Sequence, residues 1–387
     1  MTAPAGVTRG QVAASRGQGR PERRAARDPF LDNAKFLLIV LVVVGHNWVP
    51  ALDDSRVVKA AYMVVYSFHV PAFVLLCGYF SRGFEGRRDQ WRKLVTTVLV
   101  PYLIFQTAYA AVSSWAADEP FTLHFSGPIY VTWFLLALFF WRATAPLLKS
   151  LPHPILISVA VSLATGITIV DTGFALSRTL QLLPWFAIGL FLQPRHIELL
   201  HQRWVRIAAV PVFAVAAATA FALAPSFDVR WLDREWSAGR LGVSLPVDVA
   251  FALGLHVVTA VMIVAALALV PRSRSRLTAL GAFTMYPFLL HGLVVRSAQH
   301  LGVHSFLISE GALGIAAITA GAILLPFLLA TPWVRTATRW AVEPGSIRLR
   351  RQRPVEEAPN AAPATAQPRE PAARERSVRE DAQVGSR

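Results

Sequence analysis

Charged residues and cysteine are both scarce in this chain. Asp, Glu, Lys and Arg make up 16% of its 387 residues, whereas soluble domains carry about 25%. The chain has one cysteine, Cys77, so an internal disulfide framework and a CxxC metal or redox motif are excluded. Hydrophobic residues reach 54%, above the roughly 45–50% of soluble domains. A single water-soluble core cannot bury this much apolar material, so the composition predicts an integral membrane protein.

Acidic residues are fewer than basic ones, 23 against 38, and the formal net charge is +15. Such an excess is typical of nucleic-acid-binding proteins when it is concentrated on a soluble basic domain. Here the basic residues lie between and beyond apolar runs. Nucleic acid is therefore excluded as a partner, and the lipid bilayer is the expected environment.

Apolar segments of roughly 16–25 residues recur along the chain, the length that a helix needs to cross ~30 Å of hydrocarbon. We expect an all-α bundle of about ten transmembrane helices in a membrane domain at residues 30–335. The segment 178–193 is short enough to be tilted, broken or partly re-entrant. The predicted segments are 32–50, 61–80, 94–114, 128–148, 154–171, 178–193, 204–224, 246–270, 277–297 and 309–333.

Two regions without apolar periodicity flank this domain. Residues 1–29 are rich in Arg, Ala, Gly and Gln, and they lack the apolar stretch of a cleavable signal peptide. Residues 336–387 are rich in Arg, Glu, Pro and Ala, a composition that buries too little apolar surface to offset the entropy of ordering. Both regions are predicted to be disordered tails.

Basic residues are distributed unequally between the two sides of this arrangement. An even number of helices puts both termini on one side, which then holds 30 of the 38 basic residues, against 7 on the other side. Basic residues favour the cytoplasmic side of a membrane. We therefore expect both termini in the cytoplasm. The basic residues are 34 Arg and 4 Lys, a bias that with abundant Ala is typical of GC-rich bacterial genomes, so we expect a bacterial inner membrane.

The first predicted helix carries polar groups at membrane depth, where their cost makes them functional by default. Lys35 and His46 are eleven residues apart, about three turns, so they share a face at roughly 16 Å along the axis, with Asp32 close to that face. A cation at one end and an imidazole at the other suit an extended donor such as acyl-CoA. Alternatively, Lys35 reaches the membrane surface and His46 bonds a neighbouring helix.

Several strings stand out between about residues 29 and 335. They are DNAKF at 32–36, GH at 45–46, SFHVPAFVLLCGYF at 67–80 and WFLLALF at 133–139, with less specific ones at 178–189 and 286–291. Together they resemble the acyltransferase 3 family of integral-membrane acyltransferases. They look closest to the branch of fucose 4-O-acetylase-like sugar O-acetylases. The resemblance implies a roughly ten-helix domain that moves an acyl group, usually acetyl from acetyl-CoA, to hydroxyls of sugars or glycan precursors.

The resemblance also implies roles for individual residues. The family's motif of a basic residue, ten residues and a histidine falls on Lys35 and His46, as donor contact and general base or acyl carrier. Asp32 and Asn33 in the same string are candidate substrate contacts. His69 is either a second active-site imidazole or a bridge that holds a proline-distorted second helix.

Three further residues are candidates. Arg82 either contacts the CoA phosphates or anchors the chain at the cytoplasmic surface. Arg178 either orients the acceptor or reaches the opposite surface. His291 is either a substrate contact or a helix-packing histidine. In the longest outer loop, 224–245, Trp231 and Trp236 either hold a sugar ring or belong to an interfacial turn.

Metal and nucleophilic-cysteine chemistry are not expected. His300 and His304 have the spacing of two metal ligands, but no third ligand or HExxH pattern accompanies them. An apolar setting disfavours the thiolate of Cys77. The alternative function is a secondary transporter or flippase with His46, His69 and His291 in a proton relay.

Overall fold

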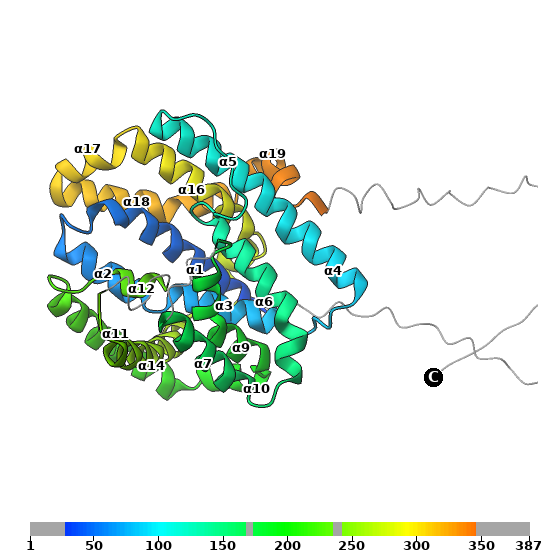
Figure 1. Cartoon of the computed structure of the whole chain (residues 1–387). Helices are drawn as coiled ribbons and strands as arrows, with labels where there is room; N and C mark the ends of the chain where they lie inside the picture. Colours follow the sequence, from blue (N-terminus) through cyan, green and yellow to red (C-terminus); the bar gives the residue numbers. More distant parts are fainter. Residues whose placement is uncertain (1–27, 168–172, 235–241, 346–387) are drawn as a thin grey trace, which may run out of the picture. The chain divides into compact units, whose positions relative to one another are not determined.

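The structure is a computed structural model that describes residues 28–167, 173–234 and 242–345. Within these ranges the chain is helical and has no strand (Figure 1), which confirms the predicted all-α class. The helices are α1 (Pro29–Trp48), α2 (Arg56–Tyr66), α3 (His69–Phe80), α4 (Arg88–Leu94), α5 (Val100–Ala117), α6 (Thr132–Ser150), α7 (Pro154–Ile167), α8 (Leu176–Gln181), α9 (Leu183–Phe191), α10 (Pro194–Leu200), α11 (Arg203–Leu223), α12 (Arg230–Asp233), α14 (Leu245–Leu269), α15 (Arg276–Gly281), α16 (Met285–His300), α17 (Val303–Ser309), α18 (Gly311–Leu329) and α19 (Pro332–Val342).

Six helical segments in the described ranges are long and apolar enough to cross a membrane. The other predicted segments fall on helices that are shorter, interrupted or less apolar, so the count of ten and the cytoplasmic termini stay predictions. The six segments are Pro29–Ala51, Arg56–Phe80, Arg88–Ala117, Arg203–Leu223, Leu245–Leu269 and Gly311–Leu329.

Two of the predicted segments are interrupted beside a proline. In the second segment, α2 ends at Tyr66 and α3 begins at His69, because the ring of Pro71 clashes with the carbonyl four residues before it and has no N–H to donate. The segment 178–193 is broken between α8 and α9, where Pro184 occupies the first turn of α9. Both parts of the second segment, α2 and α3, contact α1.

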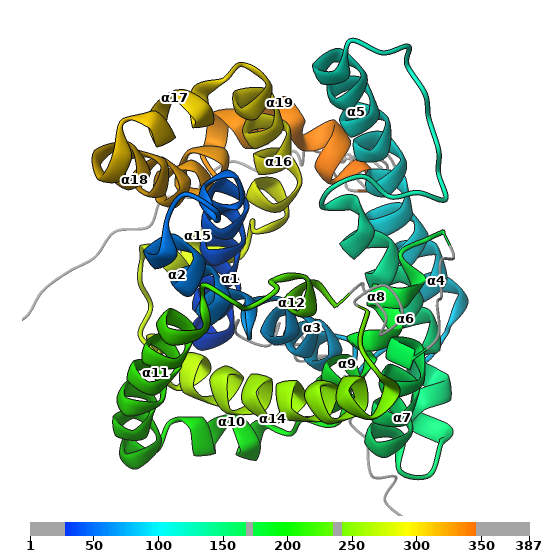
Figure 2. The same cartoon turned by 60° about the vertical axis from the view of Figure 1, so that its left-hand side comes forward.

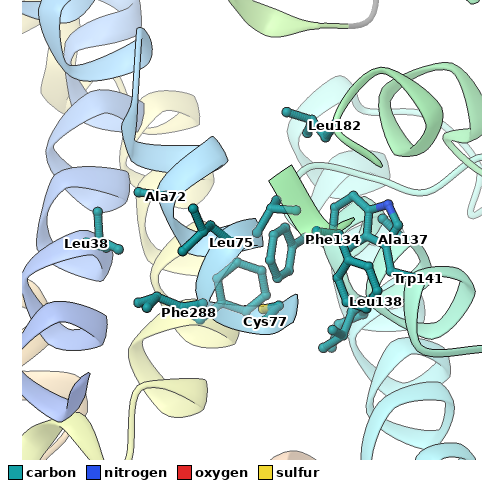
Figure 3. Close-up of a cluster of buried hydrophobic side chains, with 14 of the residues drawn as sticks. Leu38, Ala72, Leu75, Cys77, Phe134, Ala137, Leu138, Trp141, Leu182 and Phe288 are labelled. Carbon is teal, nitrogen blue, oxygen red and sulfur yellow. The ribbon is translucent and has the colours of Figure 1, made fainter. Parts of the chain in front are cut away.

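Helix α3 lies at the centre of the apolar core. Figure 3 shows it between Leu38 and Phe288 on one side and Phe134 and Trp141 on the other. Its closest neighbour is α9, because a Cβ at Gly78 would overlap the carbonyl oxygen of Phe186, and a Cβ at Gly189 would overlap that of Leu75. Small residues allow such close backbone contact between membrane helices.

The variant Gly78→Ala is expected to lower the free energy of unfolding by about 1–3 kcal/mol, because the new methyl group forces α3 and α9 apart. The measurement is the thermal unfolding midpoint of the purified protein in detergent. Gly254→Ala on α14 is the control, because a Cβ there meets nothing within 4 Å. An unchanged midpoint for Gly78→Ala would contradict the close contact.

Helix α19 covers part of the region that the sequence assigns to a disordered tail, 336–387. Ala341 and Val342 are buried, and the guanidinium carbon of Arg335 lies 3.3 Å from the ring centroid of Phe283. An average composition over the Arg-rich region hides this short apolar face. At the other end, α1 begins at Pro29, capped by Asp28. Residues 1–27 and 346–387 lie outside the described residues.

Candidate active site

A cavity of about 590 Å³ lies among α1, α2, α3, α6, α8, α12 and α16. Figure 2 shows α12 between α1 and α8, with α3 beside it. Along α1 the cavity is lined from Ile39 to His46, and the following turn adds Val49. The cavity therefore runs along the later half of α1, away from Lys35.

A pair of imidazoles stands at the wall of this cavity. His46 lines the cavity, and its Nδ1 lies 2.9 Å from Nε2 of His291. His291 is fully buried, and its own Nδ1 lies 2.7 Å from the carbonyl oxygen of Pro287. The two rings are nearly parallel, with centroids 5.2 Å apart. A chain of hydrogen bonds thus leads from the cavity wall to the backbone of α16.

This chain defines the proton positions of both neutral rings. A carbonyl oxygen only accepts, so Nδ1 of His291 carries the proton and donates to Pro287. Nε2 of His291 then holds a lone pair and accepts from Nδ1–H of His46. Consequently Nε2 of His46 holds the lone pair that remains for a ligand. An imidazole oriented in this way can accept a proton from a hydroxyl group.

His69 is the second imidazole of the cavity wall. Its Nδ1 donates to the carbonyl oxygen of Val65 at 2.8 Å, which leaves the lone pair on Nε2. Its ring meets the ring of Tyr66 edge-on at 4.5 Å, and Tyr66 stacks on Tyr62 at 3.6 Å. Both tyrosines line the cavity. His69 thus belongs to an aromatic wall of α2 and α3, and it is 1% exposed.

Aromatic rings and one arginine form a further part of the cavity wall. Tyr130 lies 4.8 Å from the His46 ring, centroid to centroid. The guanidinium carbon of Arg178 lies 4.6 Å from the ring centroid of Trp133, and both residues line the cavity. Stacking on Trp133 holds the cation beside the space that His46 faces. The structure thus places the predicted residue Arg178 at the site.

Two charged residues at the end of α12 complete the lining. Asp233 and Arg234 both contribute to the wall, and Arg234 is 8% exposed. Trp231, one turn earlier, packs on Phe251 with centroids 4.3 Å apart and lines a smaller neighbouring pocket. Trp236 lies outside the described residues. The predicted sugar-binding loop thus contributes charged groups to the main cavity.

Lys35 and Asp32 lie at the other end of α1 and do not line the cavity. Nζ of Lys35 pairs with Oδ1 of Asp32 at 2.7 Å, and it lies 5.1 Å from the ring centroid of Phe80. The side chain of Lys35 is 22% exposed, against 7% for Asp32. The ion pair thus stands near the end of α3, with the cation the more accessible partner.

Arg82 is bound to the same end of α3. Its Nε donates to the carbonyl oxygen of Tyr79 and its Nη1 to that of Leu192, both at 3.0 Å. Arg142 and Lys149 donate to groups of the same turn. Lys35, Arg82, Arg142 and Lys149, here named the α3-end cluster, therefore gather four cations where the helix carbonyls accept hydrogen bonds. The motif reasoning missed Arg142 and Lys149.

Asn33 is fully buried and holds two distant segments together. Its Nδ2 donates to the carbonyl oxygens of Pro271 at 2.8 Å and Ser273 at 3.1 Å. Its Oδ1 accepts from Oγ1 of Thr278 at 2.7 Å. These contacts occupy the donors of its amide group. The sequence predicts a substrate contact at Asn33. In the structure its side chain instead connects α1 to the 271–278 segment.

The histidines considered as metal ligands have other partners. Nε2 of His304 lies 3.0 Å from Oδ1 of Asn47, and the ring of His300 meets Trp115 at 4.3 Å. In the part of the chain that the structure describes, no three His, Cys, Asp or Glu residues are placed to hold a metal ion. Cys77 lies in the apolar core, away from the cavity lining.

One cavity is thus lined by three predicted residues, His46, His69 and Arg178. His291 does not line it but contacts His46. The lining residues without a predicted role include Tyr62, Tyr66 and Tyr130, whereas Asp233 and Arg234 belong to the predicted outer loop 224–245. Tyr62, Tyr66 and His69 recur at helical spacing along the chain, and this is a signal that could have indicated one face. The loop residues carry no such periodicity.

Comparison with known proteins identifies the family. The family model of acyltransferase 3, described as an acyltransferase domain, matches residues 28–331. No curated protein and no solved structure matches the chain. The matched region includes all the cavity-lining residues and six apolar helices that can span a membrane. The chain therefore belongs to the acyltransferase 3 family and is a membrane acyltransferase.

Proposed function

We propose that the protein transfers an acyl group, acetyl by preference, from acyl-CoA to a hydroxyl of a sugar, glycan precursor or glycosylated metabolite. His46 acts as the general base. The observation that carries this proposal is the pair of hydrogen bonds that connects His46 to His291 and His291 to the Pro287 carbonyl. It leaves the lone pair of His46 at the wall of a cavity large enough for a sugar.

The reaction needs one proton acceptor and one proton donor. Nε2 of His46 removes the proton from the acceptor hydroxyl while its oxygen attacks the thioester carbonyl carbon. The tetrahedral intermediate then collapses, the carbon–sulfur bond breaks, and the imidazolium returns the proton to the CoA sulfur. His291 acts as a positioning residue, since its lone pair keeps the Nδ1 proton of His46 in place.

The cavity wall supports a sugar as acceptor. Aromatic faces pack on sugar rings while hydroxyls hydrogen-bond to charged side chains. Tyr66, Tyr130 and Trp133 provide the faces, and Asp233 and Arg178 provide the polar groups. This fits the sugar O-acetylase branch that the sequence strings resemble.

The α3-end cluster supports a donor that carries phosphates. Cations near the end of a helix would bind the charged end of acyl-CoA, and the reactive thioester would then extend along α1 toward His46. The separation of Lys35 and His46, eleven residues on one helix, corresponds to roughly 16 Å. In this proposal the cluster faces the cytoplasm of a bacterial cell and the cavity lies toward the outer side.

The direct test is acyl transfer by the full-length purified protein in nanodiscs. We expect acetyl-CoA plus a panel of free sugars and glycosides to release CoA thiol only when an acceptor is present, with acetylated product identified by mass spectrometry. The absence of transfer across the panel and for acetyl-, propionyl- and succinyl-CoA, together with solute uptake driven by a pH gradient, would favour the transporter instead.

Replacement of Lys35 tests the donor site. Lys35→Ala is expected to raise the KM for acetyl-CoA about tenfold with little change in kcat, because one charge-assisted contact is worth about 1.5–3 kcal/mol at most when well formed and less when exposed. Lys35→Arg should retain most of the affinity. Lys59→Ala, at a half-buried position of α2 that does not line the cavity, is the control. An unchanged KM in Lys35→Ala would remove Lys35 from the donor site.

A further inference from the structure

We propose that Arg234 forms a binding site for an anionic group of the acceptor, a carboxylate or a phosphate, at the α12 side of the cavity. This inference rests on the proposed function and names its substrate class. The acceptor would be an acidic sugar or a sugar phosphate. Arg234 belongs to the predicted outer loop 224–245, where no role was assigned to it, and it lines the cavity as the residue that directly follows α12.

Arg234 is a buried cation with little compensation. It is 8% exposed, and its one hydrogen bond within the described residues is a 3.4 Å contact from Nη2 to Oγ1 of Thr259. A guanidinium has five donors, and a buried charge is costly unless it is paired. Burial lowers the pKa of Arg234 to about 10, so the group remains cationic at neutral pH. A neutral hydroxyl at this distance does not balance that charge.

Among the described residues, the buried carboxylate of Asp248 shares a small pocket with Arg234, and Asp248 is 3% exposed. Both residues line a neighbouring pocket of about 20 Å³, together with His256, which has room for one water molecule. A water there can connect the carboxylate with one part of the guanidinium. Arg234 also lines the main cavity, and its fork of donors can serve both spaces.

Arg234 lines the same cavity as His46, the proposed base. Arg178 lines the same cavity as His46, and its stacking on Trp133 adds a second cation to the wall. An acceptor whose ring lies against the aromatic residues would have one hydroxyl toward His46 and a charged substituent toward Arg234. The carboxylate of Asp233 on the same wall accepts hydrogen bonds from sugar hydroxyls. The lining thus suits a sugar that carries both hydroxyls and an anionic group.

The test is direct binding of three probes that share one ring: glucose, glucuronate and glucose 1-phosphate. Dissociation constants are measured on the full chain in detergent. We expect at least one anionic probe to bind tenfold or more tightly than glucose, and its identity distinguishes a carboxylate from a phosphate. Arg234→Gln should weaken that probe at least tenfold and leave glucose unchanged.

Arg230→Gln is the matched control, because Arg230 begins α12, is 46% exposed and pairs with Asp228 at 2.6 Å. It should leave all three constants unchanged. Equal binding of the three probes by the wild type, or a preference that survives Arg234→Gln, would overturn the inference. A loss in Arg230→Gln as large as in Arg234→Gln would do the same, because it would indicate general surface charge.

One further variant and one further ligand keep the outcome clear. If Arg234→Gln does not fold, Arg234→Gln combined with Asp248→Asn removes both buried charges, and the same loss of anion preference is expected. CoA binding should be unchanged in Arg234→Gln, and a tenfold loss of CoA affinity would place Arg234 in the donor site and overturn the inference. Binding needs no turnover, so an anion preference without acyl transfer would reject only the proposed function.

Discussion

The variant His46→Ala is expected to lose acyl transfer by a factor of about 10²–10⁴ in kcat, the usual contribution of a positioned general base. Nδ1–H of His46 donates to His291, which donates to the Pro287 carbonyl. These two hydrogen bonds leave the lone pair of His46 on Nε2. The measurement is the rate of CoA thiol release by the purified protein with saturating acetyl-CoA and acceptor. The KM for acetyl-CoA should change little, because the α3-end cluster is intact.

His69→Ala is the informative comparison, because His69 lines the same cavity. It is expected to keep measurable transfer, with the loss confined to the KM of the acceptor. His300→Ala, whose ring packs on Trp115, controls for the general effect of histidine removal. Full activity in His46→Ala, or a larger kcat loss in His69→Ala than in His46→Ala, would contradict the assignment of the base.

Much of the site could be predicted because its residues occur in local patterns. The spacing of Lys35 and His46 on one helix is a property of the sequence alone, and α1 is indeed continuous from Pro29 to Trp48. Pro71 likewise indicated a distortion of the second apolar segment, and the short length of the sixth indicated a break there. The structure interrupts both segments. Periodicity and backbone chemistry act over a few residues, so one sequence suffices to detect them.

Contacts between distant segments were not predictable in this way. A helical face can be inferred, but the neighbour that covers each part of it cannot. Asn33 illustrates this, because its partners Pro271 and Thr278 come from the far end of the chain. Arg234 is a second example. It directly follows α12, and its left-handed backbone, at φ 55°, ends that helix. No apolar period marks such a residue.

The contact between His291 and His46 also joins distant segments of the chain. The sequence left open whether His291 contacts substrate or packs between helices. In the structure it is fully buried and bonded to His46, so its expected role is to hold the proton position of the base. His291→Leu should lower kcat by about a hundredfold or more, because loss of the group that orients a catalytic imidazole costs up to about 10⁴ in serine proteases.

His291→Gln separates positioning from packing. The amide oxygen of glutamine can accept from Nδ1–H of His46, whereas leucine has a similar bulk but no acceptor. We therefore expect His291→Gln to recover at least tenfold of the activity lost in His291→Leu, with the KM for both substrates unchanged in the two variants. Equal kcat values for the Gln and Leu variants would contradict this, since a packing role depends on shape and is indifferent to the lone pair.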